Sequence, residues 1–143
     1  MSELYDSIRL THLAATFTGA LGVDAPEGAE SPCDIVLDRL FAEFGEGGAD
    51  RVFIYNPDAV ALWLFQKYTE LFKDAISRTQ IQLPILSVMP SVTPVCFASM
   101  YSGVMPEIHG IMRYEKPVLK IKTVFDALAA AGKRCAIVST EGD

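Results

Sequence analysis

Apolar residues recur along the chain in two patterns, one with helical spacing and one as short continuous runs. Helical spacing, with glycine after several of the segments, predicts helices over residues 9–21, 32–44, 58–78, 94–102 and 123–131. Apolar runs of strand length predict strands over residues 51–55, 83–89 and 133–139. The stretch 103–117 contains repeated glycine and proline and is expected to be irregular.

The alternation of strands and helices predicts an α/β fold, a parallel sheet flanked by helices, because parallel strands need a long crossover that is usually a helix. We expect a single α/β domain or fragment over residues 1–143, with a helical N-terminal segment at 1–49 and a βαβ portion at 50–143. Ligands of such sheets bind at the carboxyl ends of the strands. The chain ends four residues after the third predicted strand, so we expect an incomplete portion of a longer domain.

Composition and charge narrow the function classes. Half of the 143 residues are hydrophobic and 21% are charged, which is typical of a globular protein. The net charge of -6 disfavours binding to nucleic acids and to anionic membranes. No apolar run approaches the ~20 residues that span a bilayer, and no signal-peptide pattern is seen, so we expect a cytoplasmic protein. The three cysteines fit neither a disulfide framework nor a zinc knuckle.

Thr93 is the best-placed reactive side chain of the predicted fold. It follows the predicted strand 83–89 and precedes Pro94, which favours the first turn of a helix, so Thr93 is expected to be the N-cap of helix 94–102. Unpaired backbone N–H groups and the helix dipole favour negative charge at that point, which would stabilise an alkoxide or a bound phosphate oxygen. The alternative is a plain capping role, which contributes about 1 kcal/mol of stability.

A longer motif surrounds Thr93. The threonine is followed by Ser102-Gly103 and then by Pro106-Glu-Ile-His-Gly-Ile111. In this order and spacing, residues 90–111 resemble the nucleophile segment of the alkaline phosphatase superfamily, in particular its type I phosphodiesterase and nucleotide pyrophosphatase group. Residues 123–138 are similar to the next helix and strand of that group, so the resemblance covers about residues 50–140.

The resemblance implies a metal-dependent phosphoester hydrolase, a phosphodiesterase or phosphatase, that acts on a small phosphorylated substrate. Thr93 would attack phosphorus in line and form a phosphothreonine, with two divalent metal ions, usually zinc, assisting attack and hydrolysis. The group carries Asp-Gly after its first strand, whereas this chain has Asn56-Pro57-Asp58. The resemblance therefore implies Asp58, Asn56 and Thr93 as metal ligands; the alternative is that residues 56–58 form a turn and a helix cap.

The other metal ligands of the group, which include histidines, have no counterpart in this chain. Of its two histidines, His109 matches a position that shapes a loop, and His12 is expected to be structural. We therefore expect the parent protein to be an enzyme and this chain alone to be inactive and to bind no metal. The alternative is a truncated or degenerate relative that serves as a binding or assembly module. An incomplete sheet also leaves an unpaired edge, which predicts a homo-oligomer.

Overall fold

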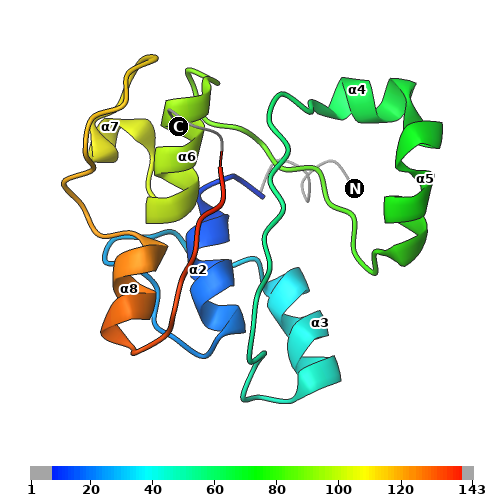
Figure 1. Cartoon of the computed structure of the whole chain (residues 1–143), viewed down its shortest axis with the longest axis horizontal. Helices are drawn as coiled ribbons and strands as arrows, with labels where there is room; N and C mark the ends of the chain where they lie inside the picture. Colours follow the sequence, from blue (N-terminus) through cyan, green and yellow to red (C-terminus); the bar gives the residue numbers. More distant parts are fainter. Residues whose placement is uncertain (1–7, 140–143) are drawn as a thin grey trace.

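Short helices joined by extended and irregular chain form the structure, a computed structural model that describes residues 8–139 (Figure 1). The helices are α2 (His12–Ala20), α3 (Asp34–Phe44), α4 (Leu62–Lys67), α5 (Thr69–Arg78), α6 (Thr93–Ser102), α7 (Pro106–His109) and α8 (Val124–Ala130). The longest of them, α3, has 11 residues. None of the helices in the described range has the length and apolarity that a bilayer crossing needs.

The predicted parallel sheet is wrong for the described part of the chain. Helix accounts for 43% of the structure and strand for 2%, and residues 8–139 form no sheet. The nearest approach to one is an isolated parallel bridge between Arg9 and Leu86. There the N–H of Leu10 donates to the carbonyl of Leu86 at 3.0 Å, and the N–H of Leu86 donates to the carbonyl of Ile8 at 2.9 Å. The protein is therefore a helical assembly with extended connections rather than a helix-flanked sheet.

The three predicted strands fail because pairing is a tertiary event that local sequence does not specify. Residues 51–56 and 133–139 run as extended chain in Figure 1, but no ladder joins them to a neighbour within the described residues. Their apolar side chains remain in solvent, as shown by exposed fractions of 87% for Phe53 and 98% for Val138. An apolar run of strand length indicates extended backbone, and a sheet requires in addition a paired strand and a covering layer.

The predicted helices are confirmed with altered ends, except for the one over residues 58–78. That segment begins as a helix only at Leu62 and is divided at Tyr68, where φ is -119° and ψ is 37°. The hydroxyl of Thr69 donates to the carbonyls of Phe65 and Gln66, both at 3.0 Å, and such local bonds compete with the regular helical ladder. Within the predicted irregular stretch, residues 106–109 form the short helix α7.

Helices α2, α6 and α8 pack on one another, and the buried core cluster lies around α6. The buried centre of this cluster consists of Val88, Val95, Ala98 and Ile111. Buried apolar contacts therefore fix α6 to the segments directly before and after it. Gly103 ends α6 in the left-handed region at φ 78°, and a Cβ atom there would lie 2.5 Å from the Cβ of Ala29. Glycine is therefore required both by the backbone turn and by the close packing of the loop before α3.

The helices α4 and α5 stand apart from this core (Figure 1). Neither helix contains a buried residue, and both pack chiefly on each other. Their contact includes a tilted aromatic pair, Phe65 and Phe72, with ring centroids 5.0 Å apart. The chain that enters this pair of helices carries Asp58, and the chain that leaves it leads to Thr93.

Candidate functional site

Thr93 lies at the start of α6 but is not its N-cap. The capping position is Val92, whose φ of -116° and ψ of 150° are extended, and the helix has no side-chain capping hydrogen bond. Thr93 is the first helical residue, with Pro94 directly after it. The predicted capping role is therefore wrong, and the hydroxyl of Thr93 is left available for a different contact.

That contact is with Asp58, which lies 35 residues earlier in the chain. The Oγ1 atom of Thr93 is 3.4 Å from Oδ1 and 3.5 Å from Oδ2 of Asp58, and the hydroxyl is the donor. The Thr93 residue is half-buried and Asp58 is exposed. The pair is thus an open, solvent-accessible hydroxyl–carboxylate contact at the amino end of a ten-residue helix.

The turn that presents Asp58 has an unusual backbone. Ala59 has φ of 57°, which places a residue with a Cβ atom in the left-handed region. Its N–H donates to Oδ1 of Asp58 at 2.8 Å, so the same carboxylate oxygen meets both the turn and Thr93. A backbone held in a costly conformation beside a reactive pair motivates a functional interpretation of this turn.

Asn56, the third residue of the predicted site, does not join the pair. It is exposed, and it makes no hydrogen bond to any residue in the described range. The structure therefore brings together two of the three predicted site residues, Thr93 and Asp58, and leaves Asn56 two positions before the turn.

A small polar group precedes α6 and was not anticipated from the sequence. The Oγ atom of Ser87 lies 3.1 Å from Oγ of Ser91 and 3.4 Å from Sγ of Cys96. Ser87 and Ser91 precede Thr93 in the chain, and Cys96 lies in the first turn of α6. Their only sequence signal is the presence of serine on both sides of a proline, which is too common to indicate a site.

The His109 side chain is buried, and both of its ring nitrogens form hydrogen bonds within the protein, which indicates a structural role. Its Nδ1 atom accepts a hydrogen bond from the N–H of Ile111 at 3.1 Å, so the ring proton is on Nε2. Nε2 then donates to Oγ of the buried Ser99 at 2.9 Å, which links α7 to α6. Burial lowers the pKa of His109, while the nearby Glu107 carboxylate raises it. Because Nε2 already carries a proton, His109 is not poised to take one from Ser99.

His12 belongs to a second polar cluster, centred on Glu30. The Nδ1 atom of His12 meets the carbonyl of Ser31 at 2.8 Å, and its Nε2 lies 3.3 Å from a carboxylate oxygen of Glu30. The same oxygen accepts a hydrogen bond from the fully buried Thr11. These contacts tie the loop before α3 to the start of α2, which is consistent with the structural role expected for His12.

The donors near Thr93 do not fit a two-zinc site. In residues 8–139 no three side chains of histidine, cysteine, aspartate or glutamate gather closely enough to hold a metal ion. Thr93 and Asp58 offer one hydroxyl and one carboxylate, whereas a zinc site takes at least three protein ligands. Both histidines are engaged elsewhere, so no nitrogen ligand reaches this pair.

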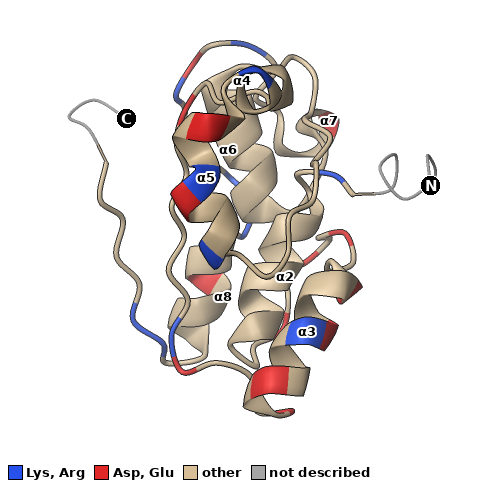
Figure 2. Ribbon diagram, turned by 90° about the vertical axis from the view of Figure 1, so that its right-hand side faces the viewer, with Lys and Arg blue, Asp and Glu red and all other residues tan. Residues whose placement is uncertain are grey.

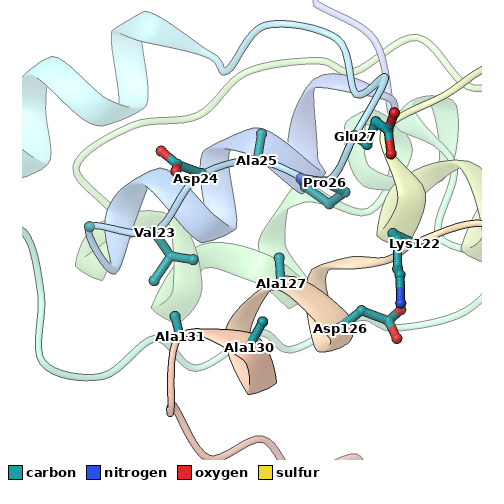
Figure 3. A pocket seen from close by; sticks show the side chains of 11 residues that line it. Val23, Asp24, Ala25, Pro26, Glu27, Lys122, Asp126, Ala127, Ala130 and Ala131 are labelled. Carbon is teal, nitrogen blue, oxygen red and sulfur yellow. The ribbon is translucent and has the colours of Figure 1, made fainter.

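A groove of about 560 Å³ lies between the loop after α2 and α8, away from Thr93 (Figure 3). It is lined by residues 22–27 and by Lys122, Asp126, Ala127, Ala130 and Ala131. The Asp126 carboxylate accepts hydrogen bonds from the hydroxyl and the N–H of Thr123, both at 2.8 Å. These bonds lower the pKa of Asp126, with a smaller contribution from Lys122. This carboxylate is thus occupied in capping α8.

Comparisons of the chain with protein-family models, with curated proteins and with solved structures found no match.

Proposed function

We propose that Thr93 is the nucleophile of a phosphoester hydrolase that acts on a small phosphorylated substrate, and that Asp58 is its proton acceptor. The observation that carries this proposal is the contact of the Thr93 hydroxyl with both carboxylate oxygens of Asp58. We place the activity in the cytoplasm, where the free thiols Cys33, Cys96 and Cys135 stay reduced.

Thr93 and Asp58 complement each other in the proposed reaction, because one supplies the attacking oxygen and the other accepts its proton. A threonine hydroxyl is a weak nucleophile until a base takes its proton, and a carboxylate within hydrogen-bond reach supplies that base. As the Thr93 oxygen bonds to phosphorus, its proton passes to Asp58, and the ester oxygen leaves phosphorus and takes a proton from solvent. Water then attacks the phosphothreonine; Asp58 returns its proton to the Thr93 oxygen as that bond breaks, and phosphate is released. The amino end of α6 adds unpaired backbone N–H groups that favour the negative oxygens of the phosphoryl group.

The motif supports the same assignment. The segment that resembles the nucleophile region of the alkaline phosphatase superfamily places its threonine at a helix start, and Thr93 begins α6. Two metal ions are part of that resemblance, but the donors beside Thr93 do not fit such a site. The proposal therefore departs from the inactivity expected of this chain from its sequence, because Asp58 takes the place of the metal ions as the group that activates Thr93.

A direct test is transfer of a phosphoryl group to Thr93. The full chain is incubated with an activated aryl phosphoester, with and without added zinc or manganese, then digested and analysed by mass spectrometry. The unsubstituted chain (called the parent chain in these tests) and T93S, which keeps the hydroxyl, are expected to carry phosphate at position 93. T93V keeps the branched shape without the oxygen and is expected to carry none. A chain that stays unmodified under every condition, or T93V that releases the aryl alcohol as fast as the parent, overturns the proposal.

A non-catalytic assembly module is the second candidate function. It is favoured by the long apolar segments that the chain leaves in solvent, among them Phe53, Tyr55 and Val138 with exposed fractions of 87%, 79% and 98%. Large exposed apolar surfaces in proteins commonly mark sites of association.

A further inference from the structure

Two extended segments of the chain have backbone groups without partners. Residues 51–56 and 134–138 make no backbone hydrogen bond to any residue in the described range. Figure 1 shows both as extended chain, one running along the helices and the other leading away from α8 toward the C-terminus. An unpaired row of N–H and C=O groups is a template for pairing with another strand.

The side chains of both segments suit a strand that is covered after pairing. In the first segment Phe53 and Ile54 have exposed fractions of 87% and 42%, and in the second Ile137 and Val138 have 64% and 98%. Adjacent residues of a strand point to opposite faces, so each segment offers an apolar side chain on both of its faces. Such two-faced apolar strands are normally found inside sheets.

One pair of opposite charges favours a parallel orientation of the two segments, with Arg51 directly after Asp50 and Lys133 directly before Arg134. Asp50 precedes the first segment, and Arg134 begins the second, where Figure 2 shows basic residues as the chain leaves the helices. Both residues are exposed, and neither makes an ion pair in the described range. A parallel arrangement brings Arg134 next to Asp50, whereas an antiparallel arrangement places these charges at opposite ends.

We propose that residues 134–138 of one copy of this chain pair as a parallel strand with residues 50–54 of a second copy. In this register Arg134 faces Asp50, Ile137 faces Phe53 and Val138 faces Ile54. The two apolar pairs lie on opposite faces of the new ladder, and the ion pair marks its amino end. The chain already forms one parallel bridge, between Arg9 and Leu86, so this mode of pairing is available to its backbone.

A second copy is the favoured occupant because the two segments do not meet within one chain. No hydrogen bond joins them in the described range, and Figure 2 shows residues 133–139 leaving the helical body at the left of the view. Each copy offers both segments, so association can close into a dimer by reciprocal exchange or continue from copy to copy.

Sedimentation equilibrium of the full chain over a range of concentrations tests the proposal. The average mass is expected to rise above the 15.6 kDa of one chain as concentration increases. I137P removes one donor and blocks the ladder at a position outside every helix, so it is expected to abolish the rise while circular dichroism keeps its helical signal. A parent chain that remains a monomer, or an I137P variant that associates as the parent does, overturns the proposal.

Charge reversal identifies the partners. D50K alone and R134D alone are each expected to weaken association about fivefold or more, because like charges then face each other. An equimolar mixture of the two variants is expected to regain association, because the new carboxylate at position 134 of one copy meets the new ammonium group at position 50 of the other. The exposed control D38K changes the net charge by as much as D50K does and is expected to have little effect.

The association measurements on these variants distinguish which segment pairs with residues 134–138. A mixture that stays as weak as the single variants shows that Asp50 and Arg134 do not face each other between copies, and it overturns the proposed pairing. Association that ignores D50K but is lost in I137P points to pairing of 134–138 with itself and also overturns it. T93V is expected to associate as the parent chain does, so failure of the catalytic proposal and failure of this one are distinguishable.

Discussion

The hydroxyl of Thr93 donates to Asp58 across 35 residues of chain, with 3.4 Å between Oγ1 and Oδ1. The contact joins the turn before α4 to the first residue of α6, two segments that no sheet connects. In the proposed reaction it supplies the hydroxyl with a base, at the end of a helix where negative charge is favoured.

Replacement of Asp58 by asparagine keeps the size of the side chain and removes its charge. We expect the rate of phosphoryl transfer to Thr93 in D58N to fall about 100-fold or more, because an amide oxygen does not accept the proton. The rate is measured by release of the aryl alcohol, with D38N on the exposed face of α3 as the control for lost charge. A D58N chain with the parent rate would show that Asp58 is only a neighbour of Thr93.

The left-handed backbone at Ala59 predicts that glycine is the better residue there. With φ at 57°, the Cβ atom of Ala59 costs about 1–2 kcal/mol, of which the greater entropy of unfolded glycine offsets part. We expect A59G to raise the free energy of unfolding by about 0.5–1 kcal/mol in urea titrations. A75G is the matched control, because Ala75 is exposed within α5 and has no left-handed backbone, so glycine there should lower stability by about 1 kcal/mol. Equal effects in both variants would contradict a strained turn.

Gly103 and Gly110 allow the cost of a left-handed backbone to be separated from the cost of a steric clash. Both are left-handed, with φ of 78° and 81°, but a Cβ atom at Gly110 meets nothing within 4 Å, while one at Gly103 meets Ala29 at 2.5 Å and Ala14 at 2.9 Å. We expect G103A to reduce the free energy of unfolding by about 1–3 kcal/mol more than G110A does. Similar losses in thermal unfolding of the two variants would show that the loop before α3 moves aside.

The buried ring of His109 predicts a loss of stability in mild acid. Burial lowers its pKa in the folded state, so between that value and the ordinary His pKa near 6.5 the unfolded chain binds more protons than the folded one. The contribution is fully present above about pH 6.5 and is lost as the pH falls through the lower folded-state pKa. Urea titrations from pH 8 to pH 5 measure the slope, which H109Q should reduce. An unchanged slope in H109Q would assign the titration to another group.

Local sequence was sufficient for α2, α3, α6 and α8, and for the place of Thr93 at a helix start. Pro94 suits only the first turn of a helix, and Gly103 suits the left-handed residue that ends one, so α6 could be predicted from its own residues. The buried Ser99 and His109 contact arises within the same motif, but its direction follows from the backbone N–H of Ile111, which no residue pattern reveals.

Only the tertiary structure decided which segments meet. The apolar runs at 51–55 and 133–139 specify extended backbone, but a ladder forms only where a second strand arrives, and none does in the described range. The same limit applies to Asp58 and Thr93. Their side-chain types and order suggested a common site, yet the contact depends on a turn at Ala59 whose φ of 57° is unfavourable for alanine. Helix and strand propensities depend on residues close together in sequence, whereas strand pairing and backbone strain depend on how the whole chain packs.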